Sequence, residues 1–258
     1  MLRLWQRLRQ RREQRAVERR AIPEALWQHT LRHYPFLARR NADDAAELRR
    51  LSSLFLDAKE FSGAHGLQVS DAMAVAIAAQ ACLPVLKLGL QAYDGFVGIV
   101  VQPDEVQVRR EVVDEHGVVH EYDDLLAGEA MAGGPVMLSW RDVLEAGDTS
   151  AWGYNVVLHE FAHVLDMGDG QADGVPPLPS AAARRHWHRV LTQQFEDFSD
   201  AVRARRGTVV DPYGAESPDE FFAVASEAFF VTPHDLQAQM PALYILLASY
   251  YRQDPAAG

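Results

Sequence analysis

Two histidines spaced four residues apart constrain this chain more than any other feature of its sequence. The stretch "VVLHEFAHVLDMGDG" begins at Val156 and carries His159, Glu160 and His163. Four residues turn an α-helix by about 400°, so both imidazoles project from one helix face and can hold one metal ion. Glu160 lies about 100° round the helix from His159, where it suits a general base acting on a metal-bound water. The motif therefore predicts a helix that carries a catalytic metal site.

The flanking residues predict where this helix begins and ends. Asn155 is a candidate N-cap, and Gly168 or Gly170 can end the helix. The metzincin class of zinc peptidases is excluded, because its pattern needs glycine and histidine where this chain has Asp166 and Asp169. Asp166 then has two interpretations, as an acceptor for an imidazole N–H or as a surface charge.

A catalytic zinc needs three protein ligands and one open position, so a third ligand is required. Asp169 lies just past the predicted helix end, and the later segment "SPDEFFAVASEAFF" supplies Glu220 and Glu227. These two glutamates share one helix face, but roughly 10 Å of helical rise separates them, so only one can bind the ion directly. The residues alone leave Asp169, Glu220 and Glu227 as alternatives.

Length and charge limit the class of protein. The 258 residues can bury a substantial core, and 36 acidic against 25 basic residues argue against direct binding to nucleic acid. The single cysteine, Cys82, lies in an apolar stretch and is predicted to be a core residue. We expect a cytoplasmic protein, because the sequence has no secretory signal, no membrane span and no possible internal disulfide.

The chain is predicted to have a short basic arm followed by one domain. Residues 1–20 hold eight arginines and two glutamates, and we expect them to be mobile or loosely helical. Residues 21–258 are expected to form a metallopeptidase domain. Its helical N-terminal part covers about 21–92 and its catalytic core about 93–258.

The spacing of apolar residues predicts a mixed α+β fold. Helices are expected within 24–60, as a buried pair around 72–90, as the metal-binding helix, as a long amphipathic helix from 181, and as two closing helices. Strands are expected at "FVGIVVQP", on both sides of a turn in "EVQVRREVVDEHGVVHEY", and at "GGPVMLSW". The last strand either lies in the core or pairs with an extended peptide substrate.

Several of these segments resemble one known family. "HEFAHVLDMGDG", "PDEFFAVASEAFF", "AAQACLPVLKLGLQAY", "GPVMLSW" and "LYILLASYYRQDP" look like segments of the Mlc titration factor A family of bacterial zinc peptidases. The catalytic core is also similar to the protease domain of anthrax lethal factor. The lethal factor domain has a tyrosine seven residues before a Glu-Phe-Phe-Ala sequence, and Tyr213 and Glu220 match this pattern here.

The resemblance implies a gluzincin-like zinc metallopeptidase domain. In that arrangement His159, His163 and Glu220 bind Zn²⁺, Glu160 is the general base, and Tyr213 donates a hydrogen bond to the oxyanion. It implies a peptide or protein substrate and favours Glu220 as the third ligand. Apart from the resemblance, Glu227 is expected to accept an imidazole N–H, as outer carboxylates usually do around zinc, with a surface charge as the alternative. It leaves open whether the activity is that of an aminopeptidase or an endopeptidase.

The family's name also implies a protein partner. A Mlc-like transcription repressor of sugar uptake is the expected partner, and the peptidase is then linked to its regulation. The alternative is a binding protein that sequesters the repressor and has secondary or no peptidase activity.

Overall fold

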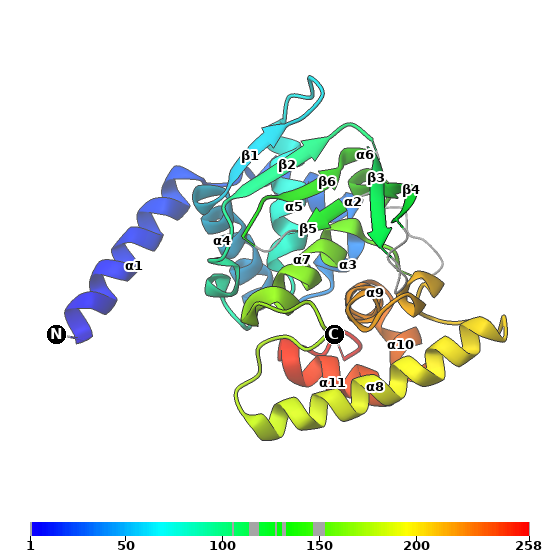
Figure 1. The fold of residues 1–258 in the computed structure, drawn as a ribbon. Helices are drawn as coiled ribbons and strands as arrows, with labels where there is room; N and C mark the ends of the chain where they lie inside the picture. The colour runs from blue at the N-terminus through cyan, green and yellow to red at the C-terminus, as the bar shows by residue number, and fades with distance from the viewer. Residues whose placement is uncertain are drawn as a thin grey trace.

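The computed structural model describes residues 2–104, 106–113, 119–126, 128–130, 133–146 and 153–257, and Figure 1 shows their arrangement. The helices of its N-terminal half are α1 (Leu2–Arg19), α2 (Glu24–His33), α3 (Pro35–Ala38), α4 (Ala42–Ala58) and α5 (Asp71–Cys82). Those of the C-terminal half are α6 (Trp140–Glu145), α7 (Val156–Asp166), α8 (Ala181–Arg203), α9 (Pro218–Val231), α10 (Pro233–Gln239) and α11 (Pro241–Tyr251). Short 3₁₀ turns are η1 (Leu90–Tyr93), η2 (Met167–Asp169) and η3 (Pro212–Ala215).

A small mixed sheet lies on one side of the helices. Its strands, in spatial order, are β1 (Glu60–Gly63), β2 (Gly98–Gln102), β6 (Val136–Ser139) and β5 (Gly128–Ala130). β1, β2 and β6 run parallel, whereas β5 is antiparallel to β6. The predicted α+β fold with a small mixed sheet is therefore confirmed.

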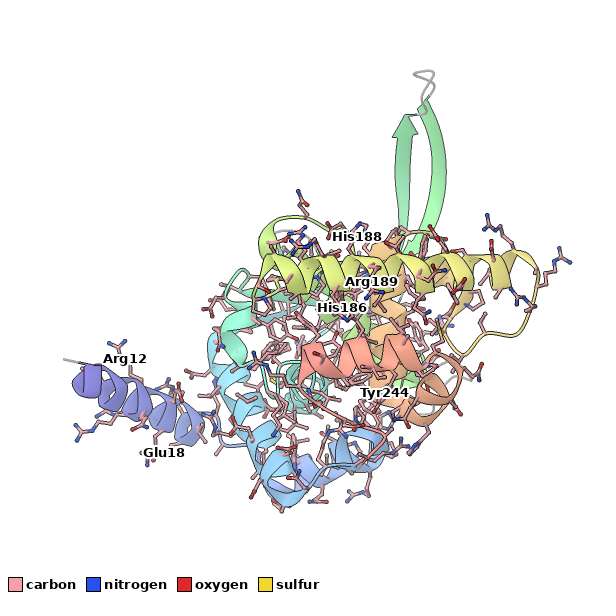
Figure 2. The ribbon with its side chains drawn as sticks, turned by 90° about the horizontal axis from the view of Figure 1, so that it is seen from below. Arg12, Glu18, His186, His188, Arg189 and Tyr244 are labelled. Atoms are coloured by element: carbon pink, nitrogen blue, oxygen red, sulfur yellow. The ribbon has the colours of Figure 1, made fainter. Side chains whose placement is uncertain are left out.

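A separate antiparallel hairpin precedes β5. It consists of β3 (Val106–Val113) and β4 (Val119–Leu126), and it projects from the rest of the molecule in Figure 2. Both strands match the expectation from the sequence, while the expected turn at 114–117 lies outside the described residues.

An aromatic cluster fixes the orientation of α7. Phe161 is fully buried, and its ring lies 5.0 Å from Tyr93, 5.7 Å from Phe55 and 5.8 Å from Phe96, measured between centroids. Phe161 is two residues from each histidine of the motif, so it points to the opposite face of the helix. Burying such a side chain stabilises the fold by roughly 1.5–3 kcal/mol, and here it turns the histidines away from the aromatic cluster and toward α9.

Asn155 begins α7 as predicted. Its Oδ1 accepts a hydrogen bond from the Leu158 backbone N–H at 2.9 Å, which satisfies one of the free donors at the helix start. Its Nδ2 donates to Oε1 of Gln80 on α5 at 2.7 Å, and both side chains are fully buried. The helix ends at Asp166, and Gly170 closes the following 3₁₀ turn in a left-handed conformation. One asparagine thus joins the helix start to the core.

Two expectations about helices were wrong. The apolar stretch 72–90 forms one helix, α5, followed by turns, because Pro84 follows its end and cannot continue the backbone hydrogen bonding. The last predicted helix is split into α10 and α11 at Met240, again before a proline. Cys82 is fully buried at the end of α5, as expected.

α1 extends away from the body of the molecule in Figures 1 and 2. Its C-terminal end is tied to α4 by Arg19, whose Nε and Nη2 bind the two carboxylate oxygens of Asp57 at 3.0 and 2.8 Å. Arg50 of α4 also pairs with Glu13 of α1. No helix in the described part of the chain is long and apolar enough to span a membrane.

We predict that Asn155→Ala lowers the free energy of unfolding by about 2–4 kcal/mol, because it removes a cap and leaves a buried acceptor on Gln80. The matched control is Asn41→Ala. Asn41 caps α4 through the Asp44 N–H at 2.9 Å but is exposed, so a loss of about 1 kcal/mol is expected. Urea denaturation of both variants tests this, and equal losses would contradict it.

Candidate metal centre

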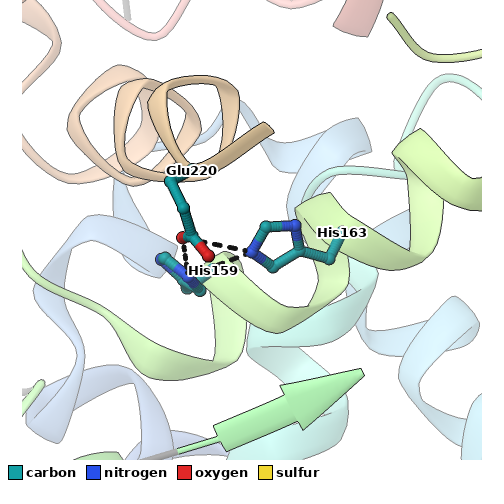
Figure 3. A group of neighbouring side chains, drawn as sticks. All are labelled: His159, His163 and Glu220. Atoms are coloured by element: carbon teal, nitrogen blue, oxygen red, sulfur yellow. Dashed lines mark hydrogen bonds and ion pairs between the residues drawn. The ribbon is translucent and has the colours of Figure 1, made fainter. Parts of the chain in front are cut away.

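Three side chains from α7 and α9 meet at one point, as Figure 3 shows. Nε2 of His159 lies 3.2 Å from Nε2 of His163, and Oε2 of Glu220 lies 3.1 Å from the first and 3.4 Å from the second. The histidines come from successive turns of α7, and Glu220 comes from the first turn of α9. Among the described residues, no other group of three histidine, cysteine or acidic side chains is close enough to hold an ion.

The three distances fit a tetrahedral metal site. Bonds of about 2.0–2.1 Å from a central ion give a tetrahedron with edges of about 3.3 Å, close to the separations of these atoms. Oε2 of Glu220 is buried and has no hydrogen-bond partner, so its contacts with the two imidazoles are close approaches without hydrogen-bond geometry. Two imidazole nitrogens and one carboxylate oxygen that lie this close together could hold a divalent ion.

The electrostatics of Glu220 agree with this arrangement. Burial opposes ionisation of its carboxyl, but His159 and His163 outweigh burial and lower its pKa. The carboxylate form, which a metal ion requires, is therefore the stable form near neutral pH.

Glu227 lies behind His159, on the side away from the ion position. Its Oε1 is 2.8 Å from Nδ1 of His159, and Oε2 accepts a hydrogen bond from the Asn155 backbone N–H. Burial works against the charged imidazole, but the flanking Glu220 and Glu227 raise the pKa of His159 well above its usual value. A carboxylate at Nδ1 fixes the orientation of the ring and leaves Nε2 facing the ion position.

Glu160 is almost fully buried beside the edge of the sheet. A Cβ atom at Gly128 of β5 would lie only 2.4 Å from its Oε1, so only glycine leaves room for this carboxylate. Burial raises the pKa of Glu160 to about 6, although His159 and His163 oppose the shift. A carboxyl with such a pKa is suited to accept and return a proton near neutral pH.

The strand next to Glu160 is β5, and the sequence did not single it out. Residues 133–140 were expected either to form a core strand or to offer a strand edge to a peptide, and the structure agrees with the first alternative. β6 lies inside the sheet between β2 and β5, so both of its edges are occupied. Among the described strands, β5 is the edge on the side of the metal centre. The sequence could not identify β5 as the edge strand, because three residues are too few to show a strand-like alternation of apolar and polar side chains.

Tyr213 lies on η3, beside the metal centre. Its ring centroid is 6.2 Å from that of His159, and the residue is 43% exposed. η3 can pack directly on α9 because a Cβ at Gly214 would lie 2.5 Å from Val224. The tyrosine is thus held near the start of α9, close to Glu220.

The aspartates after His163 have other contacts. Asp169 pairs with Arg184 of α8 at 2.9 Å and does not join the ligand group. Asp166 is fully buried, and its Oδ2 accepts a hydrogen bond from the Gly174 backbone at 2.8 Å. A Cβ at Gly174 would lie 2.5 Å from the carbonyl oxygen of Pro218, so Asp166 holds this loop against the start of α9. This role is neither of the two expected for it.

A second pair of histidines makes no comparable group. His186 and His188 lie on the exposed side of α8, where Figure 2 shows them next to Arg189. His186 contacts Arg189 at 3.0 Å and His188 contacts Thr192 at 3.4 Å.

Comparison with known proteins agrees with the metal centre. A family described as glucose-regulated metallo-peptidase M90 matches residues 8–252. An uncharacterised protein of Synechocystis is 37% identical over 95% of this chain and 89% of its own length. Proteins called Mlc titration factor A are 35% identical in Salmonella arizonae, over 90% of this chain and 92% of theirs, and 37% identical in Edwardsiella ictaluri, over 86% and 85%. The chain therefore belongs to the glucose-regulated metallo-peptidase M90 family.

Proposed function

We propose that this protein is a zinc-dependent peptidase of the gluzincin type, with His159, His163 and Glu220 as the metal ligands. The observation that carries the proposal is the near-tetrahedral spacing of three ligand atoms that face a common point. Two imidazoles and one carboxylate leave a fourth position open, which is typical of catalytic zinc sites and not of structural ones. Membership of a metallopeptidase family supports the same conclusion.

Glu160 acts as the general base. When bound, zinc supplies a Lewis acid that polarises the substrate carbonyl and lowers the pKa of a water to about 7. Glu160 would take a proton from the attacking water as the water oxygen bonds to the carbonyl carbon, and would return that proton to the amide nitrogen as the C–N bond breaks. Its pKa of about 6, raised by burial, suits both steps.

Two further side chains assist the reaction. Glu227 accepts a hydrogen bond from Nδ1–H of His159, which holds the proton on Nδ1 and leaves Nε2 free to bind the metal. Tyr213, close to the His159 ring, donates a hydrogen bond to the oxyanion that forms on the substrate.

The substrate is a peptide or protein that binds in an extended form along β5. This edge strand offers backbone donors and acceptors, and Gly128 brings it against Glu160. Pairing with β5 would place a peptide bond beside the general base.

A second candidate function is the binding of a transcription repressor in the cytoplasm. Two of the relatives described above are called Mlc titration factor A, and this name favours a Mlc-like repressor as partner. In that case the repressor would bind equally well to a protein without metal and no peptide would be cleaved.

We predict that Glu160→Gln keeps the metal but lowers peptidase activity at least about 100-fold, because the amide cannot accept the proton. The matched control is Glu196→Gln, which changes an exposed glutamate of α8 and should leave activity unchanged. Cleavage of a peptide library by metal-loaded protein, with and without chelator, is the measurement. Full activity in Glu160→Gln would exclude this residue as the base.

We predict that Glu220→Ala weakens zinc binding far more than Glu227→Ala, since only Glu220 faces the ion position. Glu227→Ala removes only the hydrogen-bond partner of His159 Nδ1, so its zinc affinity should fall by about 10-fold to 100-fold. Asp169→Ala is the control and should have no effect, because Asp169 pairs with Arg184. Titration against a competing chelator measures all three affinities. Zinc retained by Glu220→Ala but lost from either other variant would overturn the ligand assignment.

A further inference from the structure

α1 carries a concentration of positive charge that the metal centre does not use. Residues 1–20 hold eight arginines and two glutamates, which gives them a net charge of +6. Because the whole chain carries −11, the remaining residues 21–258 together carry −17. The helix is therefore a basic projection from an acidic body.

The C-terminal half of α1 is fixed to α4. Ala16 is buried, and Glu13 pairs with Arg50 of α4. Arg19 binds both carboxylate oxygens of Asp57. The N-terminal half extends beyond these contacts, clear of the body of the molecule in Figures 1 and 2.

The length of α1 separates its outer turns from the acidic body. Its 18 residues make a helix about 27 Å long, and residue 8 lies about 16 Å along the axis from the contact at Arg19. Charges on a protein surface are largely screened beyond about 8 Å at physiological ionic strength. The outer turns can therefore approach a negatively charged surface without strong repulsion from the rest of the chain.

One face of the projecting helix combines apolar and basic residues. Two groups of three residues share this face, because they are seven residues apart and seven residues make about two helical turns. They are the apolar triplet Leu4, Trp5 and Leu8, and the arginine triplet Arg11, Arg12 and Arg15.

The described residues of this face are open to solvent. Leu8 is 45% exposed, and all three members of the arginine triplet are exposed. In the described part of the chain none of these three arginines forms an ion pair, whereas Arg19 of the same helix is paired with Asp57. Figure 2 shows Arg12 on the projecting part of α1, clear of the body. The face thus offers an exposed leucine and three available guanidinium groups.

An anionic lipid surface provides both kinds of contact that this face can make. Its headgroup phosphates attract arginine, and the boundary between headgroups and acyl chains takes up leucine and tryptophan. Nucleic acid also offers phosphates to the arginine triplet, but it has no apolar layer that could bury Leu8. The combination of residues on one face therefore favours a lipid surface.

We propose that α1 binds an anionic lipid surface through this face, with the arginine triplet at the headgroup phosphates and Leu8 at the acyl boundary. The helix would lie in the plane of the surface, as amphipathic helices do, and its contacts with α4 would hold the body beside it. This binding site is separate from the metal centre, and the proposal does not depend on the peptidase mechanism.

Cosedimentation of the full chain with lipid vesicles tests the proposal. One set of vesicles contains equal parts of phosphatidylglycerol and phosphatidylcholine, and the other contains phosphatidylcholine alone. Each measurement is made with zinc-loaded protein and again with a chelator, because a metal ion could link the protein to phosphates. With and without zinc, we expect binding to the anionic vesicles to be at least about 10-fold tighter and to weaken as the salt concentration rises.

Two variants separate the basic from the apolar contribution. The combined substitution Arg11→Gln, Arg12→Gln and Arg15→Gln should weaken binding to the anionic vesicles by roughly 100-fold, because each arginine near such a surface contributes to the attraction. Leu8→Gln keeps the net charge and should weaken binding by about 10-fold, because the buried apolar side chain is lost. The unfolding temperatures of both variants should match that of the unchanged chain, since the substituted residues are exposed.

The matched control is the combined substitution Arg185→Gln, Arg205→Gln and Arg206→Gln. It removes three exposed arginines in α8 and just after it, so it changes the net charge equally and should leave vesicle binding unchanged. Equal binding to both sets of vesicles, or undiminished binding by either α1 variant, would contradict the proposal. Tighter binding of a short nucleic-acid duplex than of the anionic vesicles at the same salt concentration would assign the face to nucleic acid and overturn the proposal.

Discussion

The metal centre depends on the placement of His159 between two carboxylates of one helix. Glu220 and Glu227 are seven residues apart on α9, and His159 contacts Glu220 through Nε2 and Glu227 through Nδ1. Seven residues make about two helical turns, so both glutamates lie on the face of α9 that packs against α7. The imidazole of His159 therefore contacts a carboxylate at each of its ring nitrogens. Phe161, on the opposite face of α7, packs in the aromatic cluster and so turns the histidine face toward α9.

Periodicity and spacing in the sequence predicted the local parts of this arrangement. The helix from Val156, its cap at Asn155 and the strand at 136–139 follow from patterns within a few residues. The choice among three acidic residues did not follow from spacing. The resemblance to a family favoured Glu220, and the structure places Glu220 at the histidines, Glu227 behind one of them and Asp169 at Arg184.

The parts that sequence reasoning missed depend on contacts between distant segments. Gln80 and Asn155 are 75 residues apart, and Gly128 meets Glu160 only because β5 reverses direction beside β6. Such contacts carry no local periodicity, so they become visible only in the folded chain.

An anomalous difference map, measured from crystals of the zinc-loaded protein at the zinc absorption edge, tests the central claim most directly. The account predicts one peak bonded to Nε2 of His159, Nε2 of His163 and a carboxylate oxygen of Glu220, with bonds of about 2.0–2.2 Å and one position left open to solvent. Zinc at another place in the chain, or a fourth protein side chain closing the coordination, would contradict it.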